Sequence, residues 1–117
     1  MRASRKSSKP FIVFVTTSSK SEASRIADQI VLSHLAACAN IIPKVESIFF
    51  WKGKVEKAKE FLLIIKTEFR NLKKLEAKIR SLHSYSIPEI IGIPIAWGHK
   101  PYLAWVAEAS TSSKKKR

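Results

Sequence analysis

Two neighbouring stretches, residues 37–51 and 54–67, are rich in β-branched and aromatic residues and are separated only by a turn. Gly53 lies in that turn and can adopt the positive φ that a tight hairpin requires. At about 3.3 Å per residue each arm spans roughly 45–50 Å, whereas a helix of about 13 residues covers only ~20 Å. The outer half of this hairpin therefore extends beyond anything its own chain can place over it.

The outer half of the hairpin is also apolar. Isolated two-stranded ribbons are marginally stable in water, and an exposed apolar patch of this size usually marks an interface. The sequence therefore predicts an oligomer. The residues expected to contact neighbouring subunits are Phe49, Phe50, Trp51 and Val55.

The remaining elements complete a recognisable order. A buried strand is predicted at 11–17, a helix beginning after Ser19 with Glu22 in a capping box, a second helix over 72–82, a strand at 90–97 and a short terminal helix at 100–109. The β-α-β-β-α-β order predicts an α+β, ferredoxin-like fold with a long hairpin between its second and third strands. That fold places the second and fourth strands at the sheet edges. Only those two predicted strands contain a proline, Pro43 and Pro94, which edges tolerate.

Composition restricts the setting. A chain of 117 residues predicts one domain. Its single cysteine, Cys38, excludes an intrachain disulfide and a CxxC motif, which favours a reducing cytoplasm. No apolar run approaches the ~18 residues of a membrane span. The N-terminus lacks the apolar core of a secretory signal, although a short organelle-targeting remnant is an alternative.

The net charge of +13 is concentrated at the two ends of the sequence. Eight of the 22 Lys and Arg residues lie in segments 1–10 and 111–117, which hold no acid, so residues 11–110 carry +5. Such Ser- and Lys-rich segments are predicted to be disordered flanks of a domain at 11–110. Loose attraction to RNA or acidic surfaces follows from their charge, and solubilising segments are the simpler interpretation. We expect no nucleic-acid binding beyond this attraction.

Five short motifs give the chain a family resemblance. They are Leu-Ala-Ala-Cys-Ala-Asn-Ile-Ile-Pro at 35–43, Trp-Lys-Gly-Lys at 51–54, Glu60 with Leu-Ile-Ile-Lys-Thr at 63–67, His-Ser-Tyr-Ser-Ile-Pro-Glu-Ile at 83–90, and Tyr-Leu-Ala-Trp at 102–105. Each is weak alone, but in this order they closely resemble the CutA (divalent-cation tolerance) family. The one notable departure is Ser84, where the family usually has proline.

The resemblance implies a ferredoxin-like fold, a tight homotrimer whose long hairpin packs around neighbouring subunits, and a role in tolerance of divalent metal such as Cu²⁺. Within these motifs Cys38, His83 and Glu89 are the candidate metal ligands, because thiolate, imidazole and carboxylate suit copper or zinc. Their spacing matches no known metal motif. Cys38 could instead be a small buried apolar residue, and His83 could anchor a loop by a hydrogen bond.

A second candidate set could hold a small anion. By resemblance to the family, Lys66, Tyr85, Glu89, Tyr102 and Trp105 are expected near an intersubunit cleft. The alternative is an ion pair between Lys66 and Glu89 among packed aromatic residues. Homotrimeric PII signalling proteins, which bind ligands in their clefts, provide the corresponding alternative function: a signalling trimer that binds a small anionic ligand.

Catalysis is not predicted. The sequence has no G-x-S-x-G, P-loop or GxGxxG motif, and its only glycines are Gly53, Gly92 and Gly98. The main hypothesis is therefore a non-enzymatic cytoplasmic homotrimer that binds divalent metal at or near intersubunit sites.

Overall fold

The order of elements follows the sequence prediction closely. The computed structural model describes residues 8–112, so most of the two predicted basic segments lies outside the described residues. The elements are β1 (Pro10–Thr17), α2 (Lys20–Leu32), β2 (Cys38–Trp51), β3 (Lys54–Glu68), the 3₁₀ turn η1 (Phe69–Asn71), α3 (Leu72–Leu82), β4 (Ile90–Pro94) and α4 (Lys100–Ala109). The predicted α+β, ferredoxin-like class is confirmed.

The four strands form one antiparallel sheet in the order β2-β3-β1-β4. Pro43 in β2 and Pro94 in β4 therefore lie in the edge strands, as predicted, whereas the central strand β1 has a proline only at its first residue, Pro10. Strand β4 ends at Pro94, three residues earlier than expected from the sequence. Its partner β1 begins at Pro10, whose carbonyl accepts a final hydrogen bond from the Ile95 amide, and beyond that point β4 has no strand to pair with.

Helix α2 begins as its capping residue predicts. Ser19 has extended backbone angles, and its hydroxyl accepts a hydrogen bond from the Glu22 amide at 3.1 Å. The second half of the predicted capping box is absent, because the Glu22 carboxylate binds residues of another loop, described below.

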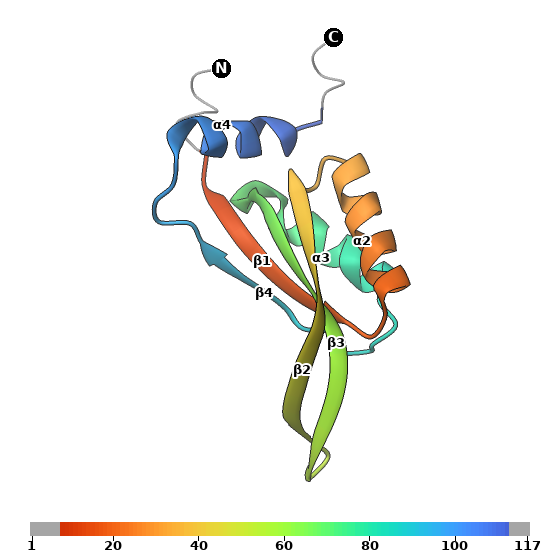
Figure 1. The fold of residues 1–117 in the computed structure, drawn as a ribbon. Coiled ribbons are helices and arrows are strands. Elements are labelled where there is room, and N and C mark those ends of the chain that lie inside the picture. The colour runs from red at the N-terminus through yellow and green to blue at the C-terminus, as the bar shows by residue number, and fades with distance from the viewer. Residues whose placement is uncertain (1–7, 113–117) are drawn as a thin grey trace.

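Helices α2 and α3 cover one face of the sheet (Figure 1) and form the core with it. Strand residues alternate between faces, so Val13, Val15, Leu63 and Ile65 point together toward the helices. The helical residues that meet them are spaced three or four apart on one side of each helix: Ala23, Ile26 and Ile30 in α2, and Leu75 and Ile79 in α3.

The opposite face of the sheet is also apolar, yet neither α2 nor α3 covers it. Phe14 pairs with Ile64 and Ile91 across three strands of this face, which is called the helix-free face below because α2 and α3 pack on the other one and α4 contacts it only near Cys38. Ile91 is 56% exposed and Ile93 is 49% exposed. An apolar sheet face left open to this extent favours association with another chain.

The β2-β3 hairpin extends well beyond the helices (Figure 1), in a molecule measuring 51 × 28 × 22 Å. A bulge between Ile42 and Val45 adds one residue to β2, with Lys44 at φ 59°. The extra residue reverses the alternation of β2, so Phe49 and Trp51 lie on the helix-free side with Ile42. The bulge therefore decides which side chains the hairpin presents on each side.

Candidate functional site

A pocket lies where the hairpin leaves the sheet. Its volume is about 710 Å³. The hairpin and the loop after α3 form its two sides. The lining residues are Thr16, Ser47, Ile48, Phe49, Trp51, Glu56, Lys57, Glu60, Tyr85, Ser86, Ile87 and Glu89. Three carboxylates against one ammonium group make this pocket acidic, with aromatic side chains on its hairpin side.

Glu60 connects the two sides of the pocket. Its carboxylate accepts hydrogen bonds from the Ser47 hydroxyl and the Tyr85 phenol, both at 2.6 Å, and it is 6% exposed. Burial, together with the hydrogen bond to Glu60 and its negative charge, raises the pKa of Tyr85 far above the usual value. Tyr85 therefore stays protonated and donates to Glu60 throughout the physiological pH range.

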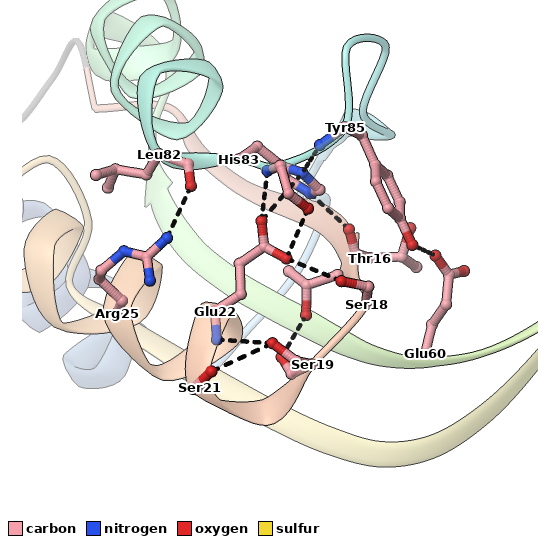
Figure 2. A network of polar contacts seen from close by, with 12 residues as sticks. Thr16, Ser18, Ser19, Ser21, Glu22, Arg25, Glu60, Leu82, His83 and Tyr85 are labelled. Atoms are coloured by element: carbon pink, nitrogen blue, oxygen red, sulfur yellow. Dashed lines mark hydrogen bonds and ion pairs between the residues drawn. The ribbon is translucent and has the colours of Figure 1, made fainter.

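A second carboxylate, Glu22 at the start of α2, holds the backbone of the same loop (Figure 2). Its oxygens accept hydrogen bonds from the Ser84 amide at 2.5 Å, the Ser84 hydroxyl at 3.1 Å and the Ser18 hydroxyl at 3.3 Å. Arg25, one turn along α2, donates to the Leu82 carbonyl at the end of α3. These contacts fix the beginning of the loop against α2.

His83 is fully engaged in this network. Its side chain is 0% exposed, and Nε2 donates to the Thr16 carbonyl at 2.8 Å. Nδ1 accepts from the Tyr85 amide at 3.1 Å and lies 3.5 Å from Glu22 Oε2. Both ring nitrogens thus have partners in one neutral tautomer. The geometry favours the loop-anchoring interpretation of His83 over the ligand interpretation.

The Glu22 network predicts a pH dependence of stability. Burial opposes ionisation of Glu22, but the hydrogen bonds from Ser84, with smaller contributions from His83 and Ser18, outweigh it and hold its pKa below the usual value of 4.5. The unfolded chain therefore takes up this proton first as the pH falls, so the stabilisation present above pH ~4.5 is lost below it. We expect urea unfolding midpoints to fall between pH 6 and pH 3.5, and to fall less in Glu22→Gln. An equal decrease in both proteins would contradict this assignment.

The three predicted metal ligands do not converge within one subunit. Glu89 is exposed and lines the pocket, His83 is buried behind it, and Cys38 lies at the opposite end of β3, paired with Lys66. In residues 8–112 no three His, Cys, Asp or Glu side chains form a preassembled metal set. A shared site for these residues would require a second subunit, so the ligand assignment stays a prediction.

The predicted cleft residues likewise divide into two groups. Tyr85 and Glu89 belong to the pocket. Lys66 donates to the Asn40 side chain, and the phenol of Tyr102 lies 3.8 Å from the Cys38 sulfur. The ring of Tyr102 lies 5.6 Å from that of Trp105, at the far end of the sheet. Lys66 pairs with Asn40 in this subunit, so the suggested ion pair with Glu89 is not formed.

Sequence reasoning missed two of the carboxylates that shape the site. Glu56 and Glu60 are four residues apart in a strand, so they share a face, and this alternation could have identified them as pocket residues. Glu22 was recognised only as part of a helix cap. Nothing in the sequence indicates that it binds a loop 62 residues away.

Comparisons with known proteins show to which family the chain belongs. Residues 11–109 match the sequence profile of the family described as "CutA1 divalent ion tolerance protein". The chain belongs to the CutA1 family. Thermus thermophilus "Divalent-cation tolerance protein CutA" is 41% identical over 97 residues, covering 83% of this chain and 94% of that protein. Rice "Protein CutA 1, chloroplastic" is 40% identical over 102 residues, covering 87% of this chain.

A solved CutA structure has the same fold. "Structure of the Periplasmic divalent cation tolerance protein CutA from Archaeoglobus fulgidus" superposes with a TM-score of 0.84 at 38% identity, covering 87% of this chain and 99% of that one. The chain spans only 58% of the rice relative's length.

Two of these relatives carry a location in their names. The rice protein is described as chloroplastic and the Archaeoglobus fulgidus protein as periplasmic. Within residues 8–112, no helix combines the length and apolar character needed to cross a membrane.

Proposed function

We propose that this CutA1-family chain functions as a homotrimer in divalent-metal tolerance, binding ions such as Cu²⁺ at or near its subunit interfaces. The observation that carries the proposal is the acidic pocket at the base of the hairpin, beside an uncovered apolar surface. The names of the relatives refer to divalent cations without specifying copper, and the resemblance to the family is the support for three subunits.

The apolar surface supports assembly. Phe50 is 71% exposed and Val55 is 62% exposed on one side of the ribbon, and Phe49 and Trp51 are 42% and 46% exposed on the other. The helix-free sheet face continues this surface, and Ile91 adds to it. Subunits that cover both regions would remove a large apolar area from water.

The charge of the pocket supports a cation as its ligand. Glu56, Glu60 and Glu89 bring three carboxylates to the pocket against Lys57. Glu60 is occupied by Ser47 and Tyr85, which leaves Glu56 and Glu89 exposed to solvent. Carboxylate oxygens bind divalent ions, and an imidazole or thiolate from a neighbouring subunit would raise the affinity and the preference for copper.

We retain Cys38, His83 and Glu89 as proposed ligands, with different requirements. Glu89 is available as the chain stands. His83 can bind a metal through Nδ1 only if the Tyr85 amide moves away from it. Cys38 is partly exposed and can contribute only to a site shared between subunits.

Calorimetric titration of Cu²⁺ into the full chain tests this proposal. We expect Glu89→Gln to weaken Cu²⁺ binding by at least about tenfold. Changing a residue that only orients a metal ligand lowers the metal affinity by about 10–100-fold, and removing a ligand should lower it at least as much. His83→Ala should weaken it further only if the loop rearranges.

Glu76→Gln is the matched control, because Glu76 is an exposed carboxylate on α3 outside the pocket. It should bind Cu²⁺ as the unmodified chain does. Unchanged affinity in Glu89→Gln and His83→Ala would place copper elsewhere, for example at His34 or His99, and would contradict the proposed site.

A small anion bound in a PII-like signalling trimer is the second candidate. Lys66 supports it, because its ammonium group lies on the helix-free face near the end where Tyr102 and Trp105 are 40% and 44% exposed. A titration with a nucleotide separates the two candidates: Lys66→Gln would abolish nucleotide binding and leave copper binding intact.

We further propose that the chain binds its ligand without catalysis and acts in the cytoplasm. The family description names tolerance of divalent ions and no reaction. The single cysteine is the feature that favours a reducing compartment.

A further inference from the structure

A second hollow of the surface lies between the two helices that cover the sheet. The end of α2 and the residues that follow it form one side of this helix groove, and α3 forms the other. Its volume is about 460 Å³, within the range of ligand-binding sites. The lining residues are Ser33, Leu35, Lys74, Ala77, Lys78 and Ser81. The helix groove shares no residue with the acidic pocket at the base of the hairpin.

The helix groove is basic. Lys74 and Lys78 are four residues apart in α3, so their ammonium groups lie on the same stripe of the helix and repel each other. Glu76, the one acidic residue of α3, is three residues from Lys73 and four from Arg80, which places it on a different stripe. No carboxylate of residues 8–112 lines the groove. Its two lysines therefore carry positive charge that an acidic ligand would neutralise.

Two serine hydroxyls add hydrogen-bond acceptors to the groove. The Ser33 hydroxyl donates to the Gln29 carbonyl at 2.8 Å, and the Ser81 hydroxyl donates to the Lys78 carbonyl at 2.7 Å. Each hydroxyl hydrogen is thus used by its own helix, whereas each oxygen can still accept from a ligand. The phosphodiester oxygens of a nucleic acid only accept, but a peptide supplies an N–H donor at every residue except proline. The hydroxyls therefore favour a peptide ligand.

We propose that the helix groove binds an acidic segment of a partner protein in an extended conformation. The carboxylates of the segment pair with the two lysines, its backbone N–H groups donate to the two serine hydroxyls, and its apolar side chains contact Leu35 and Ala77. Helices α2 and α3 lie on the side of the sheet opposite the helix-free face proposed for assembly (Figure 1). The groove therefore stays open when subunits associate through that face, and its function is separate from the proposed metal binding.

Fluorescence anisotropy with the full chain tests this proposal. The probe is a labelled peptide of about ten residues in which glutamate and valine alternate, at about 0.15 M salt to screen long-range attraction. Lys74→Gln with Lys78→Gln should weaken binding at least about fivefold, the effect of losing two exposed ion pairs. Ser33→Ala with Ser81→Ala leaves the charge unchanged and should weaken it at least about threefold, because two acceptors are lost.

The matched control is Lys73→Gln with Arg80→Gln, which removes the same charge from exposed positions of α3 outside the groove. It should change the affinity less than about twofold. An equal loss in the two charge variants would show attraction by net charge alone and would overturn the proposal, as would no loss in either. Oligouridine that binds more tightly than the peptide, and loses its binding in Lys74→Gln with Lys78→Gln, would also overturn it, because the groove would then be a nucleic-acid site.

Discussion

A chain that carries Phe50→Asp and Val55→Lys is expected to lose its quaternary structure while each subunit stays folded. The two residues are directly paired across the hairpin, and both are mostly exposed in the single chain. In the proposed trimer each contributes about 1.5–3 kcal/mol of apolar burial per subunit, and two charged side chains would have to be buried in its place. The opposite charges keep a favourable cross-strand pair, so the hairpin itself should persist.

Sedimentation velocity at micromolar concentration measures this effect, with circular dichroism as the check on folding. Leu32→Asp is the control, because Leu32 is 74% exposed at the end of α2, away from the hairpin. The control should sediment like the unmodified chain. A hairpin variant that also keeps its sedimentation coefficient would show that this ribbon is not part of an interface.

Glu22→Ala is expected to be the most destabilising change in the loop that carries Tyr85 and Glu89. It leaves the Ser84 amide and hydroxyl without their acceptor, and hydrogen bonds to a charged group contribute ~1.5–3 kcal/mol each. It also leaves a small cavity beside His83. We therefore expect the free energy of unfolding to fall by roughly 3 kcal/mol.

Chemical denaturation at pH 7 and fixed protein concentration measures this loss. Glu22→Gln retains one acceptor oxygen and should lose about half as much. Asp28→Ala, at an exposed position of the same helix, should stay within about 0.5 kcal/mol of the unmodified chain. A Glu22→Ala variant as stable as Asp28→Ala would show that the loop is held by other contacts.

The features that sequence patterns predicted well are the local ones. The positions of the strands, the Ser19 cap, and Pro43 and Pro94 in the edge strands each depend on neighbouring residues, and each is confirmed. The length of the hairpin also followed from counting residues. The end of β4 was predicted less well, because it depends on where its partner strand begins.

The site depends on contacts that no local pattern encodes. The bulge at Lys44 decides that Phe49 and Trp51 lie on the pocket side, and the pairing of Glu60 with Tyr85 joins residues 25 positions apart. The sequence does not show that the ring nitrogens of His83 already have partners, so His83 was a candidate ligand. Those partners come from the end of β1, the start of α2 and the loop of His83 itself. Cys38 and Glu89 were grouped only because both lie in family motifs. Within one subunit they lie at opposite ends of the sheet.

The central claim is that a homotrimer of this chain binds divalent metal near its subunit interfaces, and native mass spectrometry with CuCl₂ tests it most directly. We expect a single assembly at three times the 13.2 kDa chain mass, with bound copper that is lost in Glu89→Gln while the assembly remains. A monomer, or a trimer that takes up no copper, would contradict it.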